Sequence, residues 1–364
     1  MNADRFRVVF NAARGQPMAV AEAPAAPGRG SARPPVRGCA AGPAWVAVRR
    51  LCLAVWLGLG QVAWMPAAAQ IVADPGAPAT QRATVLNAPN GVPLVNIQTP
   101  NAAGVSRNTY RQFDVQRPGA ILNNSRSAVQ TQQGGWVQPN PWLATGSARV
   151  ILNEVRSNDP SLLRGYIEVA GQRAQVVIAN PAGVSCDGCG FINASRATLT
   201  TGTPQFGAGG ELEAFLVRGG QVRIEGEGLV AAGSDYTELL ARAVQVNAGV
   251  WAQRLHEATG GSRIGLDGQG EPVPATAMPD AAQGERPAFA IDVGRLGGMY
   301  AGKIPLVGTE AGVGVRNAGH IGASAGELVL TAQGRLENSG KLTASGGLRL
   351  GSGAGVLNTR PVCG

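Results

Sequence analysis

Two cysteines three positions apart are the residues with the clearest chemical potential in this sequence. Cys186 and Cys189 flank an Asp-Gly pair, and this spacing suits a metal site, a redox centre or a disulfide. A structural zinc site needs about four ligands, and outside the first 69 residues only His256, His320 and Cys363 are left to complete it. A thioredoxin-like centre needs a βαβ setting that the sequence does not show. A small disulfide is favoured, because the leader described below directs the chain to an oxidising compartment.

Carboxylates are the other residues able to carry catalysis. Polysaccharide hydrolysis or elimination needs acids gathered on one face, or an Arg-Asp-calcium arrangement. No Ser-His-Asp order is evident, and both histidines are expected in Gly-rich or polar loops. We therefore expect no catalytic residue, no metal and no cofactor, and a polysaccharide-active β-helix enzyme is the weakest functional alternative. The acids in the middle of the chain are few and spread apart: Glu211, Glu213, Glu225, Glu227, Asp235 and Glu238.

The composition predicts a repetitive β-protein rather than a helical bundle. Of 364 residues, 44% are hydrophobic but only 5% are aromatic, and 53 are glycine. The core must therefore be built from Val, Ile, Leu and Ala, with glycine at many corners.

The net charge of +8 belongs mainly to the N-terminal leader. Residues 1–69 hold eight arginines against Asp4 and Glu22, so the leader carries +6 and the remainder +2. A nearly neutral remainder does not provide the basic surface typical of nucleic-acid binding, and we expect no nucleic-acid partner.

The leader contains the elements of a secretory signal peptide. Two arginines precede Leu51–Met65, an apolar core of 15 residues, and a run of alanines follows it. Cleavage is expected between Ala69 and Gln70. A membrane anchor needs about 20 apolar residues, so we expect no stable membrane span.

A long segment precedes this signal core. Residues 1–15 include the run Arg-Phe-Arg-Val-Val-Phe-Asn, which resembles the extended signal-peptide region of large exported proteins. Residues 16–45, rich in Pro, Ala and Gly, are expected to form a disordered spacer. We interpret residues 1–69 as an extended signal peptide; a misassigned start codon is the alternative.

The stretch Val176–Gly202 predicts short strands joined by tight corners. Val176–Ile178 is a β-branched run suited to a buried strand. Asn180, Pro181 and Gly183 then predict a β-turn, because Asn suits its first position, Pro presets the second and Gly tolerates its closure. Strands this short fit a coil of successive turns better than a two-layer sheet.

Two other segments are less regular. Residues 148–155 are compatible with helix or strand, and we expect a strand. Residues 254–287 are polar and rich in Gly and Pro, which predicts a long loop off the main fold rather than a domain boundary.

The C-terminal part contains an internal repeat. Asn317, Asn338 and Asn358 follow one another at intervals of 21 and 20 residues, between short apolar runs. A period near 20 with Asn-Gly corners is typical of a parallel β-helix. The repeat breaks off at residues 360–364, which suggests a truncated version of a longer protein.

Two Asn-Pro motifs give the chain a family resemblance. They read Asn140-Pro141-Trp142-Leu143 and Asn180-Pro181-Ala182-Gly183-Val184, 40 residues apart. They resemble the Asn-Pro-Asn-Leu and Asn-Pro-Asn-Gly-Ile motifs of the filamentous haemagglutinin family, in its N-terminal two-partner secretion (TPS) domain. The third position differs in both motifs, and Val replaces Ile in the second. The resemblance implies that Asn140, Pro141, Leu143, Asn180, Pro181 and Gly183 serve secretion.

The resemblance also implies a fold and a domain organisation. We expect an all-β, right-handed, single-stranded parallel β-helix with an N-terminal cap. Residues 70–300 would form the TPS domain, and residues 301–364 would begin haemagglutinin-type repeats.

The implied partners are the Sec machinery and an outer-membrane β-barrel transporter with POTRA domains. The protein would be secreted or held at the cell surface, with host-cell or bacterial receptors. The expected function is that of the secretion domain of an adhesin; a carrier of a contact-dependent growth-inhibition toxin is the alternative.

Overall fold

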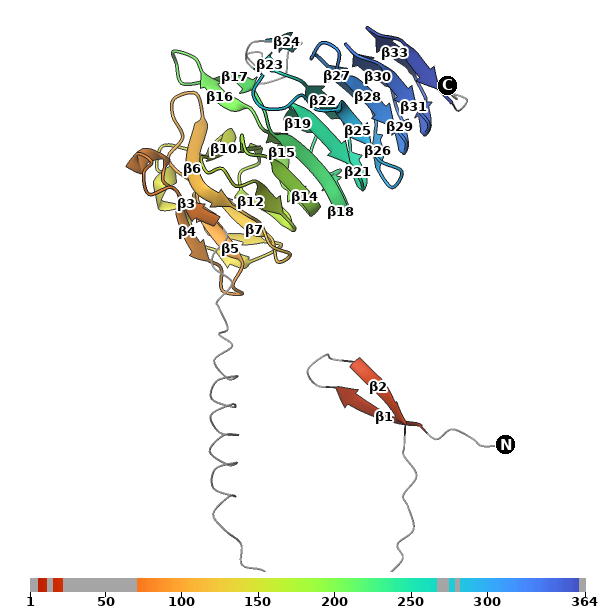
Figure 1. Cartoon of the computed structure of the whole chain (residues 1–364). Helices are drawn as coiled ribbons and strands as arrows, with labels where there is room; N and C mark the ends of the chain where they lie inside the picture. Colours follow the sequence, from red (N-terminus) through yellow and green to blue (C-terminus); the bar gives the residue numbers. More distant parts are fainter. Residues whose placement is uncertain (1–5, 12–15, 22–70, 267–274, 279–281, 360–364) are drawn as a thin grey trace, which may run out of the picture. The chain divides into compact units, whose positions relative to one another are not determined.

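The computed structural model describes residues 6–11, 16–21, 71–266, 275–278 and 282–359 (Figure 1). The chain divides into two compact units, Met1–Met65 and Pro66–Gly364, which are described separately. In the first unit, β1 (Phe6–Asn11) and β2 (Gln16–Ala21) form an antiparallel hairpin. The expected signal core and its cleavage site between Ala69 and Gln70 lie outside the described residues. No helix in the described ranges is long and apolar enough to cross a membrane.

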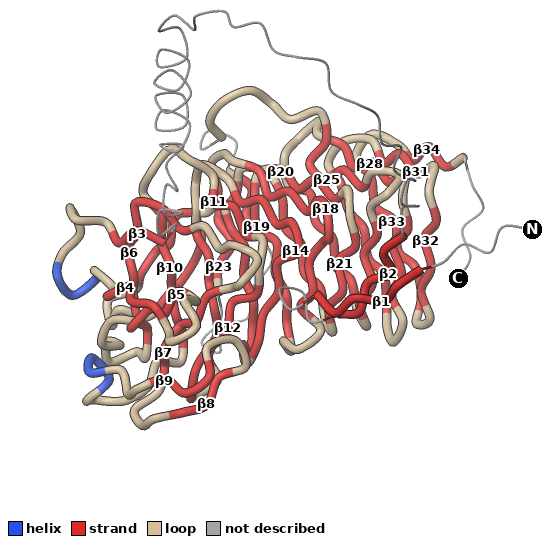
Figure 2. The backbone as a smooth tube through the Cα atoms, turned by 90° about the horizontal axis from the view of Figure 1, so that it is seen from below, coloured by secondary structure: helices blue, strands red, loops and turns tan. Residues whose placement is uncertain are grey.

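The second unit is a right-handed parallel β-helix with an N-terminal cap, which confirms the expected fold class (Figures 1 and 2). One face of its coils is a sheet with ten strands in the described residues. Their order is β3 (Ile71–Ala73), β6 (Val105–Phe113), β10 (Val150–Val155), β13 (Ala174–Ala179), β15 (Ala194–Thr200), β19 (Tyr236–Ala241), β22 (Leu255–Thr259), β27 (Ile304–Gly308), β30 (Glu327–Ala332) and β33 (Gly347–Ser352).

The other faces belong to one folded sheet with sixteen strands in the same ranges. Its main path is β4 (Thr84–Asn87), β5 (Pro93–Asn96), β7 (Ala120–Asn124), β12 (Tyr166–Gly171), β14 (Val184–Ile192), β18 (Gln221–Ala231), β20 (Ala243–Val246), β25 (Phe289–Val293), β28 (Gly314–Asn317), β31 (Leu336–Asn338) and β34 (Val356–Asn358). Its second branch contains β11 (Ser161–Leu163), β21 (Gly249–Ala252), β26 (Gly298–Ala301), β29 (His320–Ala323) and β32 (Lys341–Ala344).

This sheet bends around the coil because its two longest strands, β14 and β18, each continue through a corner. β14 pairs with β11 near its start and with β12 near its end, and β18 pairs in the same way with β20 and β21. Each strand therefore turns a corner of the coil without a break. Inward-facing side chains from all faces form one apolar core, as expected from the Val, Ile, Leu and Ala content.

The first coil is closed by antiparallel strands. β3 runs antiparallel to β6, and β4 runs antiparallel to β5, whereas the later coils pair in parallel. A short 3₁₀ helix, Ala79–Gln81, lies between β3 and β4. Open ends of stacked strands expose unpaired backbone groups, so this cap removes the edge at which the helix begins.

Two small sheets lie against the outside of the coils. β16 (Thr203–Phe206), β17 (Leu212–Val217), β23 (Ser262–Gly265) and β24 (Thr276–Ala277) form an antiparallel sheet whose Phe215 and Ile264 join a second apolar cluster. β8 (Val129–Thr131) and β9 (Gly135–Val137) form a hairpin.

These strands correct two sequence-based expectations. The predicted loop at residues 254–287 is wrong for its first part, because β22 and β23 occupy Leu255–Thr259 and Ser262–Gly265. The histidines were expected in loops, but His256 lies in β22 and His320 in β29. In β22 and β23 the apolar alternation is interrupted because the polar residues Glu257, Thr259 and Ser262 are buried. The expected strand within residues 148–155 is confirmed as β10.

The repeat near residue 317 is a stack of equivalent positions. Asn317, Asn338 and Asn358 occupy one register position on β28, β31 and β34. Asn317 donates its side-chain N–H to the Asn338 amide oxygen at 2.8 Å, and Asn338 does the same to Asn358 at 2.8 Å. The 20-residue period is therefore one turn of the β-helix.

One core position carries a carboxyl group. Glu257 lies between Leu239 and Leu306 in register, all three are fully buried, and neither Glu257 oxygen has a hydrogen-bond partner among the described residues. Burial without a partner raises the pKa of Glu257 to about 8, so the carboxyl is protonated near neutral pH.

This burial predicts a pH-dependent stability. Between the ordinary value of 4.5 and about 8, the unfolded chain releases the Glu257 proton while the folded chain keeps it. The contribution of Glu257 to the free energy of unfolding should therefore be highest below this window and fall by about 1.4 kcal/mol per pH unit through it. Urea denaturation at several pH values measures this slope, and Glu257→Gln should lose this contribution. The surface variant Glu213→Gln should keep it; equal slopes in wild type and Glu257→Gln would contradict the prediction.

Candidate functional site

The first Asn-Pro motif forms the start of a short 3₁₀ helix, Pro141–Leu143. The Asn140 side-chain oxygen accepts from the Trp142 N–H at 3.0 Å, and its amide nitrogen donates to the carbonyl oxygens of Ile97 at 2.9 Å and Asn123 at 2.8 Å. Asn140 is buried, whereas Pro141 is exposed. Leu143 points into the main core. The motif therefore anchors a surface turn to chain segments that precede it by up to 43 residues.

The second motif is the predicted β-turn at the end of β13. The Gly183 N–H donates to the Asn180 carbonyl at 3.0 Å, and the Asn180 side-chain oxygen accepts from the Ala182 N–H at 3.0 Å. Its amide nitrogen donates to the Asp159 carbonyl and to Ser161 Oγ, both at 3.0 Å. Gly183 has φ of +134°, and a Cβ there would lie 3.1 Å from a backbone oxygen, so only glycine fits without strain.

The two motifs use one arrangement twice. In each, a buried asparagine closes its own turn through its oxygen and bonds an earlier segment of the chain through its nitrogen. Pro181, like Pro141, is exposed, so each proline shapes its turn without a core contact. Among the described residues, no hydrogen bond joins the motifs to each other.

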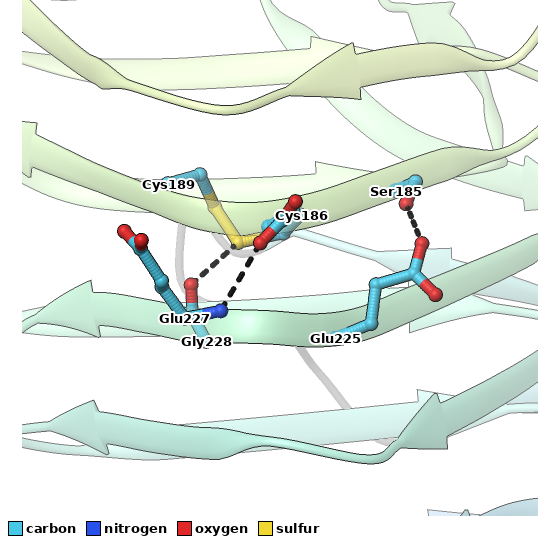
Figure 3. Close-up of a disulfide and its surroundings, with 7 residues drawn as sticks. Ser185, Cys186, Cys189, Glu225, Glu227 and Gly228 are labelled. Carbon is cyan, nitrogen blue, oxygen red and sulfur yellow. Dashed lines mark hydrogen bonds between the residues drawn. A yellow bond between two sulfur atoms is a disulfide. The ribbon is translucent and has the colours of Figure 1, made fainter. Parts of the chain in front are cut away.

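Cys186 and Cys189 form a disulfide inside β14, with their Cα atoms 5.3 Å apart (Figure 3). Both are fully buried in the main core, although side chains three positions apart on a flat strand face opposite sides. Gly188, at φ of +80°, bends the strand at the corner and turns both cysteines inward. The bend leaves Gly226, Glu227 and Gly228 of β18 without residue-for-residue partners in β14.

The disulfide occupies a register position that continues through most of the β-helix. We call this position the corner ladder; it consists of Leu163, Cys186, Ile224, Val246, Val293, Asn317, Asn338 and Asn358. Cys189 is in register with Leu229 and Val250. The cystine therefore replaces an apolar pair, and its surroundings are those of a structural bridge.

The carboxylates that the sequence singled out lie in separate contacts. Glu225 accepts from Ser185 Oγ at 2.6 Å (Figure 3). Glu227 and Asp235 form surface ion pairs, at 3.0 Å each, with Arg117 and Arg173. Glu238 is buried against Arg196, also at 3.0 Å. In the part of the chain that the structure describes, no three metal-ligating side chains are grouped closely enough to hold an ion.

A capped parallel β-helix with two anchored Asn-Pro turns, preceded by a leader, defines an exported secretion domain. The chain belongs to the TPS secretion domain family, whose model matches residues 69–338. Residues 1–51 match the model of the extended signal peptide of type V secretion systems. The expected family and the presence of an extended signal peptide are confirmed; the end of the leader at residue 69 stays a prediction. Membership implies export to the cell surface or the medium through a cognate outer-membrane transporter.

Known relatives agree with this assignment. The chain is 50% identical over 366 residues to "Toxin CdiA" of Yersinia pestis and 48% identical over 354 residues to "tRNA nuclease CdiA-2" of Burkholderia pseudomallei. These matches cover 99% and 95% of this chain, but the chain spans only 11% of each relative. The crystal structure of a filamentous haemagglutinin secretion domain is 33% identical, with a TM-score of 0.65, over 79% of this chain and 99% of that one.

The residues that hold the two asparagines were not found from the sequence. Asn123, Asp159 and Ser161 are ordinary polar residues with no motif of their own, and their partners lie 17 to 21 positions away. That distance is close to one coil. These partners can be found by searching the sequence for polar residues about one coil before each motif.

The anchoring bonds predict a large cost for removing either asparagine. Asn180→Ala leaves the buried Ser161 hydroxyl, the Asp159 carbonyl and the Ala182 N–H without this partner, so the free energy of unfolding should fall by about 3 kcal/mol. Asn140→Ala should have a similar effect. Urea denaturation of the purified chain measures both; a loss below about 1 kcal/mol would show that water replaces the bonds.

Removing the disulfide should lower the free energy of unfolding by less than removing either asparagine. This loss can be separated from the effect of core packing. A loop of this length stabilises the fold by about 2 kcal/mol through chain entropy. The variant Cys186→Ile/Cys189→Leu should lose no more than this, because Ile224 and Leu229 occupy the same register positions in the next coil. Cys186→Ser/Cys189→Ser should lose more, because it buries hydroxyls. Thermal unfolding with and without reductant compares them; equal losses in both variants would refute the packing argument.

Proposed function

We propose that residues 70–300 are the export signal that the outer-membrane transporter recognises, and that they nucleate folding of the β-helix outside the cell. The observation that carries the proposal is the pair of buried asparagines. Each one bonds a turn to an earlier segment of the chain, so each helps to hold one of the first coils against the coil before it. The boundary at residue 300 is part of the proposal, as are the roles of Pro141, Leu143, Pro181 and Gly183.

We infer that Sec delivers the unfolded chain to the periplasm, where POTRA domains of the transporter capture it. An extended segment adding to a sheet edge is a suitable mode of capture, because it uses backbone hydrogen bonds that the β-helix later makes internally. A folded coil cannot return through a narrow pore. Folding at the outer face would therefore make movement outward irreversible.

We further propose that the whole protein is a carrier of a contact-dependent growth-inhibition toxin. The relatives named as CdiA toxins and nucleases support it, because they match nearly the full length of this chain. An adhesin of the filamentous haemagglutinin type is the second candidate, supported by the solved secretion domain. In either case, the domain itself is proposed to act without catalysis, and surface receptors are bound elsewhere in the whole protein.

Secretion from a Gram-negative host tests the export signal. The chain would be expressed with and without its cognate transporter, and the culture medium compared with the periplasm. Release into the medium should depend on the transporter and should fall at least tenfold in Asn140→Ala and Asn180→Ala.

A matched variant separates recognition from stability. Asn124 is also fully buried, and its side chain bonds the backbone of Ala148 and Gln172, but it lies outside both motifs. If Asn124→Ala loses similar stability and is still secreted, the motifs serve recognition. If it fails equally, they serve secretion through folding. Transporter-independent release of the wild-type chain would overturn the proposal.

A further inference from the structure

Exposed aromatic side chains follow one outer face of the β-helix. We call Tyr166, Trp251, Tyr300 and His320 the aromatic stripe. The register runs from Tyr166 through Gly190 and Val230 to Trp251 and then Tyr300. His320 lies on the next strand, β29, in register with Gly298. The relative exposures of Tyr166, Trp251 and Tyr300 are 38%, 42% and 37%. At about 4.8 Å per strand, the stripe from Tyr166 to Tyr300 is roughly 19 Å long.

Glycines make room for each of these three rings. A Cβ at Gly190 would lie 2.4 Å from the Tyr166 ring, one at Gly249 would lie 2.2 Å from the Trp251 ring, and one at Gly298 would lie 2.8 Å from a Tyr300 ring carbon. The rings therefore lie close against the sheet. This arrangement requires glycine beside each ring, so it is a built feature of the surface.

The rings are ordered relative to one another. The ring centroids of Trp251 and Tyr300 are 6.4 Å apart with an interplanar angle of 19°, and His320 meets Tyr300 edge-on at 5.3 Å. His320 Nε2 lies 3.1 Å from Thr343 Oγ1, so a polar pair ends the stripe. Rings held this way on rigid strands lose little freedom when a ligand stacks on them.

The stripe is too small for a protein partner. At about two fifths exposure, three aromatic side chains offer roughly 250 Å² of surface, whereas a stable protein interface buries about 1,200–2,000 Å². A narrow row of rings instead fits a chain molecule whose units each present one apolar face. Pyranose rings of a polysaccharide have this form, with C–H groups on a face and hydroxyls at the edge.

A cavity of about 730 Å³ lies around the corner from the stripe. It is lined by Gln253 and Gly302, two residues beyond Trp251 and Tyr300, and by Tyr236, Arg254, His256 and Lys303. Arg254 donates to the Tyr236 hydroxyl and lies over the Tyr236 ring. Neither Arg254 nor Lys303, which lies beside it on the next coil, forms an ion pair within the described residues, whereas the acid at the cavity wall, Glu238, is paired with Arg196. The cavity therefore presents two neighbouring cations that have no acidic partner among the described residues, beside aromatic surface, and this arrangement favours an anionic ligand.

We propose that the aromatic stripe and this cavity bind an acidic polysaccharide, with its pyranose rings stacked on Trp251 and Tyr300 and its carboxylates facing Arg254 and Lys303. This binding function goes beyond export. It places a glycan-binding surface on the exported domain itself.

Polygalacturonate is the probe, with dextran as a neutral polymer of the same ring size. The folded wild-type chain should be retarded in native gels that contain polygalacturonate, and its tryptophan fluorescence should change on titration. Affinity should fall at least tenfold in Trp251→Ala and in Tyr300→Ala. Arg254→Gln/Lys303→Gln should weaken binding at low salt and reduce its salt dependence.

Matched controls make each outcome decisive. Trp136→Ala removes a tryptophan that is 64% exposed on β9, outside the stripe, and should bind as wild type does. Trp251→Tyr should retain most of the affinity. The proposal is overturned if polygalacturonate does not bind, or if dextran binds equally well. It is also overturned if Trp251→Ala binds normally, or if Trp136→Ala weakens binding as much as Trp251→Ala does.

Discussion

Every strand of a parallel β-helix depends on the coil before it for half of its backbone hydrogen bonds, and this dependence organises the protein. The first coil has no predecessor, so antiparallel strands β3 and β4 complete its hydrogen bonding. Where the chain leaves a strand to turn a corner, the ladder is interrupted, and side chains take over the bonds. Asn140 and Asn180 are the two such side chains that the family motifs mark. Their chemistry is that of ordinary turn asparagines, but their second set of bonds connects them to earlier coils.

Rules that use only neighbouring residues predicted the structure correctly where a residue type has only one suitable conformation. The run Val176–Ile178 became β13, the turn at Asn180 and Gly183 formed as predicted, and the 20-residue repeat became stacked coils. These features depend on neighbours in sequence or on an exact period. The parallel β-helix itself was predictable from them, and the family resemblance added the cap and the partner.

The remaining features depend on contacts between coils. The sequence did not predict β22 and β23. In β22, Glu257 takes a core position and His256 faces outward, so the apolar alternation expected of a strand is missing. The aromatic stripe could not be predicted because Tyr166, Trp251 and Tyr300 are at least 49 residues apart along the chain, and only the strand register brings them together. The partners of the motif asparagines are separated from them in the same way. Residues that come together only because the coils stack leave no recognisable pattern among their neighbours in the sequence.

The corner ladder has a consequence for how the coil count can vary. From Asn317 onward, the ladder repeats one residue: Asn317 donates to Asn338, which in turn donates to Asn358. Such a row has translational symmetry: a coil inserted or deleted within it would leave every remaining bond unchanged. The row before it, from Leu163 through Cys186 to Val293, has no such symmetry, because the cystine fits one coil alone. The early coils therefore define a fixed origin, and the later coils form a segment whose length evolution can change one turn at a time.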